Sequence, residues 1–272
     1  MSEPSRNPQA EQMADESMVR NLRAQIECIW PQERTIFERH ALPAQARVLD
    51  VGCGTGELVA QLGALYADAR IDGIDIDEAH LARARERCAA LGERAHFARG
   101  DAFALAAADG SYDLTICRHV VQAVPEVPRL LAELIRVTRP GGRLHVLAED
   151  YGLMQFAPTR HDSDAFWREG AWEYARRIGC DLRIGRKMPA LFAAADLRDI
   201  RCDYVIVDTL RVPRATFADI WRAWRDGYTD VVAANSSLSV ADVRAHFEDM
   251  IAAIESGYAC WHVPVITGTR EP

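Results

Sequence analysis

Residues 48–57 read VLDVGCGTGE and place three glycines at alternate positions directly after an apolar run. Gly52, Gly54 and Gly56 can adopt positive φ angles, and because they lack a Cβ they let backbone N–H groups come close to a ligand. A loop of this kind at the carboxyl edge of a parallel sheet is where nucleotides bind. The stretch therefore predicts a site for a nucleotide-like ligand rather than a simple turn. Cys53 is expected to line this site as a small filler without chemistry of its own.

The spacing of the glycines narrows the ligand. Dinucleotide-binding enzymes use G-x-G-x-x-G and hold the pyrophosphate at a helix N-terminus, whereas this chain has G-x-G-x-G followed by Glu57. An acid at the start of a helix is a poor neighbour for a pyrophosphate, and the P-loop pattern G-x-x-x-x-G-K-[ST] is absent. The loop therefore favours a ligand without a pyrophosphate.

Short apolar strands alternate with amphipathic helices over the first half of the chain. Asp77 is positioned to cap the second of these helices. The predicted strands are residues 46–52, 70–76, 95–101, 112–118 and 143–150, and the predicted helices are residues 57–67, 78–92 and 127–142. This alternation is typical of a parallel sheet covered by helices on both faces.

Further elements follow after residue 151. Two more strands are predicted at residues 200–210 and 259–270, which makes a seven-stranded sheet. We therefore predict a doubly wound, mostly parallel α/β fold of the Rossmann-like type with a helical cap. The predicted parts are a disordered tail at 1–14, cap helices at 15–45 with a new helix beginning at Pro31, and a main domain at 46–272 with helical insertions near 152–185 and 209–257.

Composition excludes several classes of protein. The net charge is −8 and the pI about 5.5, which argues against a nucleic-acid partner bound by phosphate neutralisation. No window approaches the roughly 18 apolar residues of a membrane span, and the polar N-terminal stretch is not a secretory signal. The seven cysteines are dispersed without zinc spacing, so we expect no metal site and a reducing, cytoplasmic location. A homodimer is left open.

Five stretches in order resemble the motifs of class I S-adenosylmethionine-dependent methyltransferases. They are VLDVGCGTGE, IDGIDIDEAHLARAR, ARGDAFAL, SYDLTICRHVVQAVP and RVTRPGGRLHVLAED, which together lie within residues 46–151. The small-molecule branch, which includes quinone-biosynthesis and secondary-metabolite enzymes, is the most similar. The family's base-amine methylases carry an [N/D/S]-P-P-[Y/F] tetrad where this chain has RHVV, so base methylation is in doubt.

The resemblance implies a cofactor and the residues that bind it. Asp50 would order the glycine loop and the methionine end of S-adenosylmethionine, against the bare backbone of the glycines. Asp75, at the end of a strand, would accept hydrogen bonds from the two ribose hydroxyls. Asp72 and Asp77 are rivals for this role, although Asp77 suits the helix cap better.

The same resemblance assigns the adenine and amine contacts. Ile76 would lie against the adenine face, although it could also be ordinary core. Asp101 would accept from the adenine amino group while the N–H of Ala102 donates to a ring nitrogen; a plain surface turn is the alternative for Asp101. The backbone at Arg118 would meet the methionine amine.

Catalytic candidates follow the fourth and fifth predicted strands. His119 is a candidate general base, with a structural histidine as the alternative. Of Glu149, Asp150 and Tyr151, we expect Asp150 or Tyr151 to hold or deprotonate the nucleophile, with loop capping as the alternative. The aromatic residues after 151 are expected mainly to pack helices, and some to line an apolar substrate pocket. Arg160 and His161 are weaker candidates for substrate contact.

The predicted function is methyl transfer from S-adenosylmethionine to an O, N or C atom of a small-molecule acceptor. An NAD-dependent oxidoreductase is a second hypothesis, which the glycine spacing disfavours. A non-catalytic, regulatory protein that binds S-adenosylmethionine is a third hypothesis, which an intact set of motifs does not exclude.

Overall fold

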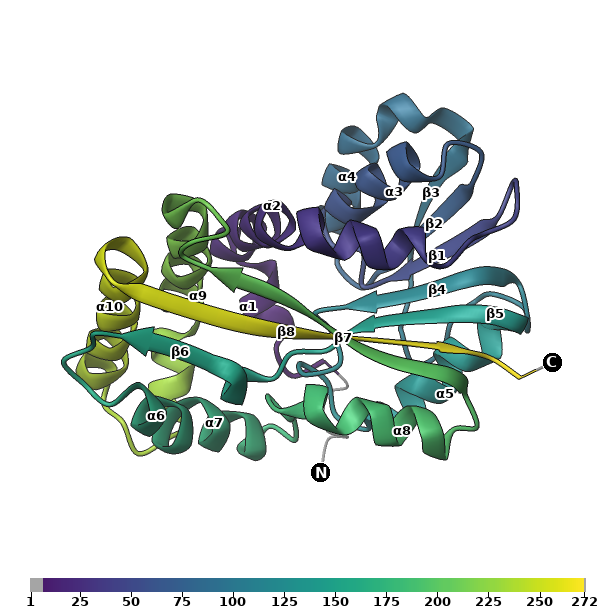
Figure 1. Ribbon diagram of the computed structural model, residues 1–272. Coiled ribbons are helices and arrows are strands. Elements are labelled where there is room, and N and C mark those ends of the chain that lie inside the picture. The colour runs from purple at the N-terminus through teal and green to yellow at the C-terminus, as the bar shows by residue number, and fades with distance from the viewer. Residues whose placement is uncertain (1–6, 272) are drawn as a thin grey trace.

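The computed structural model describes residues 7–271. Their strands form one eight-stranded sheet (Figure 1). The strand order is β3-β2-β1-β4-β5-β8-β6, with β7 paired to β8. The strands are β1 (Arg47–Val51), β2 (Arg70–Asp75), β3 (Ala95–Arg99), β4 (Tyr112–Arg118), β5 (Thr138–Leu147), β6 (Met154–Ala157), β7 (Arg198–Asp208) and β8 (Tyr258–Thr269). Strands β1 to β5 pair in parallel, and β8 is antiparallel to its three neighbours. The predicted mostly parallel α/β fold is confirmed.

The strand β6 is the one addition to the seven predicted strands, and it lies in a segment expected to be helical. It pairs with residues 258–261 of β8, whereas β5 pairs with residues 265–269 of the same strand. Because β7 pairs along residues 260–269, it occupies the opposite edge of β8. At four residues β6 is too short to give a clear alternation in the sequence, although the structure buries Met154 and Phe156 and exposes the residues between and after them.

Helices cover both faces of the sheet. In Figure 1, α3 (Glu57–Leu65) and α4 (Glu78–Arg87) lie on one face, and α5 (Val127–Val137) and α8 (Met188–Ala194) on the other. The buried side of α5 follows helical spacing, with Val127, Leu130, Leu131, Leu134 and Val137. The Asp77 carboxylate accepts from the N–H groups of Ala79 and His80, so the predicted cap of α4 is confirmed.

The N-terminal segment differs from its prediction. Residues 1–6 of the expected disordered tail lie outside the described residues, but residues 7–14 contain α1 (Ala10–Ala14). The two predicted cap helices are one helix, α2 (Glu16–Glu38), which continues through Pro31. Pro31 is exposed, so water can satisfy the carbonyl group that loses its intrahelical donor. Asp15 caps α2 by accepting from the Ser17 N–H.

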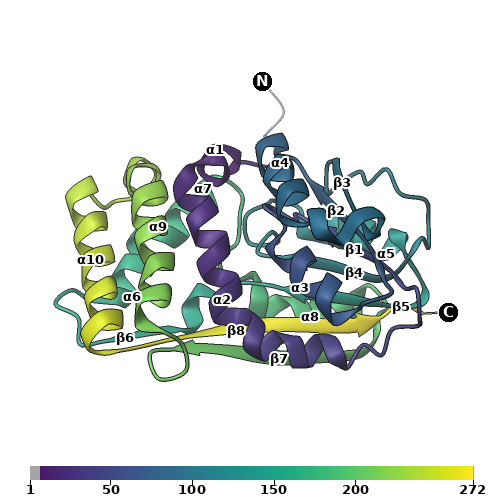
Figure 2. The ribbon, with the colours of Figure 1, turned by 90° about the horizontal axis from the view of Figure 1, so that it is seen from above.

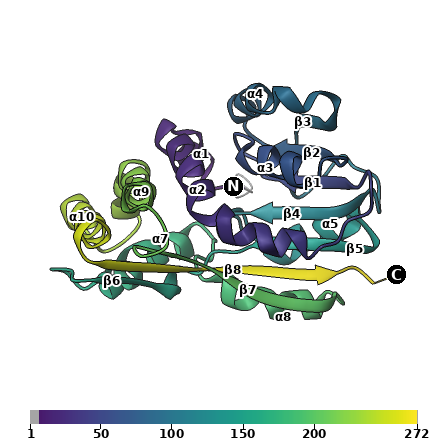
Figure 3. The same cartoon turned by 45° about the horizontal axis from the view of Figure 1, so that its top comes forward.

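A helical cap packs beside the sheet over the β6 end of β8. Helices α2, α9 (Arg214–Ala234) and α10 (Val240–Ser256) lie side by side in Figure 2 and Figure 3. The smaller segments are α6 (Ser163–Phe166), α7 (Trp172–Arg177), a π-helical turn at Trp167–Ala171, and 3₁₀ segments at Ala89–Arg94, Tyr151–Leu153 and Ile184–Lys187. Within residues 7–271, no helix is both long and apolar enough to cross a bilayer.

Aromatic side chains fill the interior of this cap. Trp221 is fully buried and packs edge-to-face on Phe156, with 4.8 Å between ring centroids, and on Trp224 at 5.0 Å. These distances are those of favourable aromatic pairs. The expectation that the late aromatic residues mainly pack helices holds for Trp221, while others, such as Trp167 and Trp224, line a cavity.

Candidate active site

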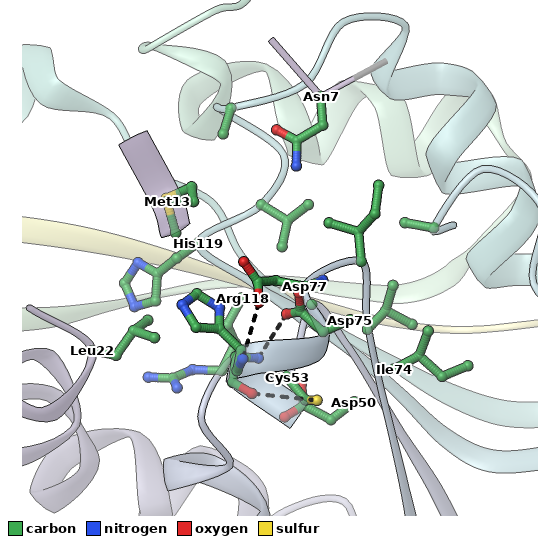
Figure 4. A pocket seen from close by; sticks show the side chains of 18 of the residues that line it. Asn7, Met13, Leu22, Asp50, Cys53, Ile74, Asp75, Asp77, Arg118 and His119 are labelled. Carbon is green, nitrogen blue, oxygen red and sulfur yellow. Dashed lines mark hydrogen bonds between the residues drawn. The ribbon is translucent and has the colours of Figure 1, made fainter. Parts of the chain in front are cut away.

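A cavity of about 410 Å³ opens at the carboxyl ends of β1, β2 and β4. Figure 4 shows its wall, which combines strand-end residues such as Asp75 and Arg118 with Met13 and Leu22 from α1 and α2. Nine of the ten predicted cofactor residues line it: Asp50, Gly52, Cys53, Gly54, Asp75, Ile76, Asp101, Ala102 and Arg118. The structure therefore brings together residues that are up to 68 positions apart in the sequence.

The glycine loop has the backbone conformation that its sequence predicts. The φ angles of Gly52, Gly54 and Gly56 are +77°, +52° and +81°. Gly56, the one predicted cofactor residue outside the cavity lining, is needed for packing as well, because a Cβ there would lie 2.9 Å from the Ala84 Cβ and 3.0 Å from its Cα. Gly56 thus lets α3 begin directly against α4.

Asp75 joins the second strand to the glycine loop. Its Oδ2 accepts from the Gly54 N–H at 2.8 Å, and its Oδ1 accepts from the Asp77 N–H at 2.9 Å. The rival Asp72 does not line the cavity; its carboxylate accepts from the Tyr112 hydroxyl and pairs with Arg47. Asp75 is therefore the carboxylate of this strand that a ligand in the cavity can reach.

The rest of the wall suits a ligand with an aromatic ring and polar ends. Ile76 is 45% exposed, which leaves an apolar surface at the cavity edge. Asp101 is held by its Oδ1, which accepts from the Phe103 N–H at 2.9 Å. Among the described residues, Gln25 Oε1 and His80 Nε2 are buried in this wall without a hydrogen-bond partner. An adenosyl group and a methionine fit this set of donors, acceptors and apolar surface.

Arg118 is paired with a glutamate that the sequence did not single out. Its guanidinium contacts the Glu33 carboxylate at 3.0 Å and 2.8 Å, and Glu33 is fully buried on α2. Burial raises the pKa of Glu33, but Arg118 and His145 outweigh it, so its pKa lies below the usual value. His145 Nε2 lies 2.9 Å from Glu33 and its Nδ1 is 3.1 Å from His40. Helix α2 is thus fixed to the cavity wall by a buried charge pair.

Burial raises the pKa of Asp50 to about 7, and the nearby carboxylates add to this effect while Arg118 opposes it. Folding therefore favours the protonated carboxyl group. This contribution to stability is complete below about pH 4 and is lost as the pH rises through about 7.

Replacing Asp50 with asparagine is expected to remove this pH dependence. Between about pH 5 and about pH 8 the wild-type group loses roughly 3 kcal/mol of stabilisation, at about 1.36 kcal/mol per pKa unit, and the substituted amide side chain cannot titrate. Urea unfolding of both ligand-free proteins at the two pH values gives the change in the free energy of unfolding for each protein. Subtracting one change from the other cancels the contributions of all titrating groups that the two proteins share. An identical pH dependence in the two proteins would contradict the shifted pKa of Asp50.

A second cavity of about 80 Å³ adjoins the first, and the two share Met13, Leu22, Gln25, His119 and Ala123 in their walls. Its other walls come from the cap and from the end of β5. Many of these walls are aromatic: Tyr151, Phe166, Trp167, Tyr174, Trp224, Tyr228 and Phe247. The sequence predicted that some aromatic residues after 151 would line an apolar pocket, and these residues do line this cavity.

His119 and Glu149 meet where the two cavities join. The Nδ1 of His119 lies 2.5 Å from Oε1 of Glu149, and Glu149 has no exposed surface. The His119 backbone has a φ of +55°, and its N–H donates to the Leu147 carbonyl at 3.2 Å. An imidazole that donates through Nδ1 presents Nε2 as an acceptor. That Nε2 is buried without a partner among the described residues, so it is available to accept a hydrogen bond from a ligand.

The other two catalytic candidates are placed differently. Asp150 is buried but lines neither cavity; its carboxylate accepts from the Arg186 guanidinium at 2.6 Å and 2.8 Å and from the Gly152 N–H at 3.0 Å. Tyr151 lines the second cavity and stacks on Trp167 at 5.4 Å. Burial, and then the Glu149 carboxylate, raise the pKa of Tyr151 well above its usual value, so its hydroxyl stays protonated.

The weaker candidates lie on another part of the surface. The Asp249 carboxylate on α10 accepts from the backbone N–H groups of Arg160 and His161, and its Oδ2 lies 2.6 Å from the His161 imidazole. Neither Arg160 nor His161 lines either of the two cavities. Glu149, by contrast, was one of three strand-end residues considered, and only its contact with His119 distinguishes it.

Comparison with known proteins agrees with this geometry. Residues 48–142 match the family model described as a methyltransferase domain. The trans-aconitate 2-methyltransferase of Deinococcus radiodurans is 42% identical over 142 residues, which are 52% of this chain and 49% of that protein. The ubiquinone biosynthesis O-methyltransferase of Aromatoleum aromaticum is 35% identical over 162 residues, which are 53% of this chain and 68% of that protein.

The fold is also found among solved structures. The [4+2]-cyclase SpnF matches with a TM-score of 0.63 and 21% identity, over 99% of this chain and 98% of that chain. This likeness concerns the fold alone. The chain spans half or less of the length of the first three curated relatives that it matches. From the family model, the curated relatives and the matching cavity, we conclude that the chain belongs to the class I S-adenosylmethionine-dependent methyltransferases.

Proposed function

We propose that the chain transfers the methyl group of S-adenosylmethionine to an oxygen, nitrogen or carbon atom of a small-molecule metabolite. The observation that carries this proposal is the pair of adjoining cavities that share His119. The larger cavity is lined by nine of the ten residues expected to bind the cofactor, and the smaller one has many aromatic walls, most of them from the cap. The relatives are named for different acceptors, so their names do not select one for this chain.

The cofactor would be held by groups of the larger cavity. The Asp75 carboxylate has lone pairs left for ribose hydroxyls after its two backbone hydrogen bonds. Ile76 offers an apolar surface and Asp101 an acceptor for the adenine. When bound, the sulfonium supplies an already activated methyl group. The protein's own task is then to orient the acceptor and to exclude water.

His119 would act as the general base for an acceptor that loses a proton. Its Nε2 can accept that proton, and the Glu149 carboxylate at Nδ1 then stabilises the imidazolium. Glu149 touches neither cofactor nor acceptor in this scheme and is a positioning residue. Met13 and Leu22 lie over both cavities, so α1 and α2 limit the access of water to the reacting atoms.

The choice of cofactor can be tested by ligand-induced stabilisation. S-adenosylhomocysteine at 100 times its Kd is expected to stabilise the protein by about 2.7 kcal/mol, and NAD at the same concentration should leave the melting temperature unchanged. Thermal unfolding with each ligand gives the comparison. Stabilisation by NAD alone would support the oxidoreductase hypothesis and defeat this proposal.

A cytoplasmic location and a small-molecule acceptor without nucleic acid are part of the same proposal. The seven cysteines form no disulfide, and six of them are buried, which supports a reducing compartment. The net charge of −8 supports an acceptor other than nucleic acid.

A further inference from the structure

The wall of the smaller cavity contains several buried hydrogen-bond acceptors without partners. Among the described residues, these include Glu149 Oε2 and His119 Nε2, together with the side-chain oxygens of Asn21, Gln25 and Gln122. Apart from His119, each of these residues is at most 6% exposed. The Glu149 carboxylate is an acceptor whichever way the amides are turned, and so is His119 Nε2 in the tautomer that donates through Nδ1. Because buried acceptors are normally paired, this wall is built for a ligand that brings hydrogen-bond donors.

The same wall contains no cationic side chain. Its described lining residues include neither Lys nor Arg, and its one acidic group is Glu149. The donors that it does offer are neutral, such as Trp167 Nε1 and the Tyr174 hydroxyl, which are also buried without partners. A ligand carboxylate would enter a site of low dielectric beside the Glu149 carboxylate, and no Lys or Arg of this wall supplies a countercharge. The wall therefore discriminates against anionic acceptors.

A cationic acceptor is disfavoured by the charge of the cofactor. The proposed cofactor in the adjoining cavity carries a sulfonium charge, and two cations in neighbouring low-dielectric cavities repel each other. The cavity also has flat aromatic walls, including Tyr151 and Trp167, which are parallel to each other within 5°. Such walls suit an uncharged ring.

We propose that the acceptor is a compact, uncharged ring compound with a hydroxyl group that reaches the His119–Glu149 pair, and that carboxylate-bearing acceptors are rejected. This inference rests on the proposed function. In the transfer, the hydroxyl oxygen forms a bond to the methyl carbon as the carbon–sulfur bond breaks. The electron pair of that bond goes to sulfur and leaves neutral S-adenosylhomocysteine, and the hydroxyl proton goes to His119 Nε2.

Three matched probes test the discrimination: 4-methylphenol, 4-hydroxybenzoate and 4-(aminomethyl)phenol. They share the ring and the hydroxyl group and differ in the charge of the group opposite it. Binding to the protein saturated with sinefungin, whose amine carries the positive charge of the sulfonium without a transferable methyl group, can be followed by calorimetry or by quenching of Trp167 and Trp224, which line the cavity. We expect 4-methylphenol to bind at least tenfold more tightly than either charged probe.

The variant Glu149→Gln removes the negative charge and keeps the shape. We expect it to reduce the preference for 4-methylphenol over 4-hydroxybenzoate to less than threefold, with unchanged affinity for S-adenosylhomocysteine. Glu248→Gln makes the same chemical change on the exposed side of α10, and we expect it to keep the wild-type preference.

Four results would overturn the inference. They are equal or tighter binding of 4-hydroxybenzoate by the wild type, equal or tighter binding of 4-(aminomethyl)phenol, binding of none of the three probes by the loaded protein, and an unchanged preference in a folded Glu149→Gln variant. Failure of S-adenosylhomocysteine to bind at all would instead remove the proposed function, and this inference with it. The comparison of the three probes on the wild-type protein tests the inference even if the Glu149→Gln variant does not fold.

Discussion

Replacing His119 with asparagine is expected to lower turnover by about 100- to 10,000-fold, the usual contribution of a general base, and to leave the affinity for S-adenosylhomocysteine unchanged. The reason is the buried Nε2 without a partner, which Glu149 orients through Nδ1 at 2.5 Å. Asparagine is chosen because it tolerates the φ of +55° at this position. The release of S-adenosylhomocysteine, with a cell extract as the source of acceptor, measures turnover.

His161→Asn is the matched control for this experiment. The His161 imidazole is bonded to Asp249 and lies at the surface away from both cavities, so this variant should turn over as the wild type does. A loss of less than threefold in the His119→Asn variant would defeat the assignment of the base. An equal loss of cofactor affinity and turnover would indicate that His119 only shapes the site.

Replacing Asp75 with alanine is expected to weaken the binding of S-adenosylhomocysteine by ~1–3 kcal/mol, the value of hydrogen bonds to a charged group. Two effects act together. The ribose hydroxyls lose their acceptor, and the Gly54 and Asp77 N–H groups lose the carboxylate that fixes the loop beside the cavity. Isothermal titration calorimetry measures the loss directly.

The control for this prediction lies on the same strand. Asp72→Ala removes a carboxylate three residues earlier that pairs with Arg47 and Tyr112 and does not line the cavity. This variant should keep the wild-type affinity for S-adenosylhomocysteine. Unchanged affinity in the Asp75→Ala variant would count against the ribose assignment.

Local patterns were sufficient to predict most of the fold. The five parallel strands, the helices between them and the Asp77 cap all follow from spacings of a few residues. Pro31 was misleading because proline is favoured at the first turn of a helix, so the sequence cannot distinguish a new helix from a tolerated proline on an exposed face. Strand β6 depends on its pairing with β8, which lies about 100 residues later.

The candidate site shows the same division between local and long-range information. The predicted cofactor residues belong to short motifs at the ends of strands, and nine of the ten line one cavity. The pair of His119 and Glu149 exists only because β4 and β5 are neighbours in the sheet. Asn21 and Gln25 look like the polar side of an amphipathic helix, and only the packing of α2 against its neighbours in the cap, such as α9, turns them into the wall of a buried cavity.

The most direct test of the central claim is a transfer experiment with S-adenosylmethionine that carries a labelled methyl group. The protein is incubated with this cofactor and a metabolite extract, and the small-molecule fraction is separated from protein and nucleic acid. We predict that the label appears in a small-molecule product together with an equal amount of S-adenosylhomocysteine, and that the His119→Asn variant forms far less of both. Binding of the cofactor by the wild type without labelled product would contradict this account and would favour a regulatory protein.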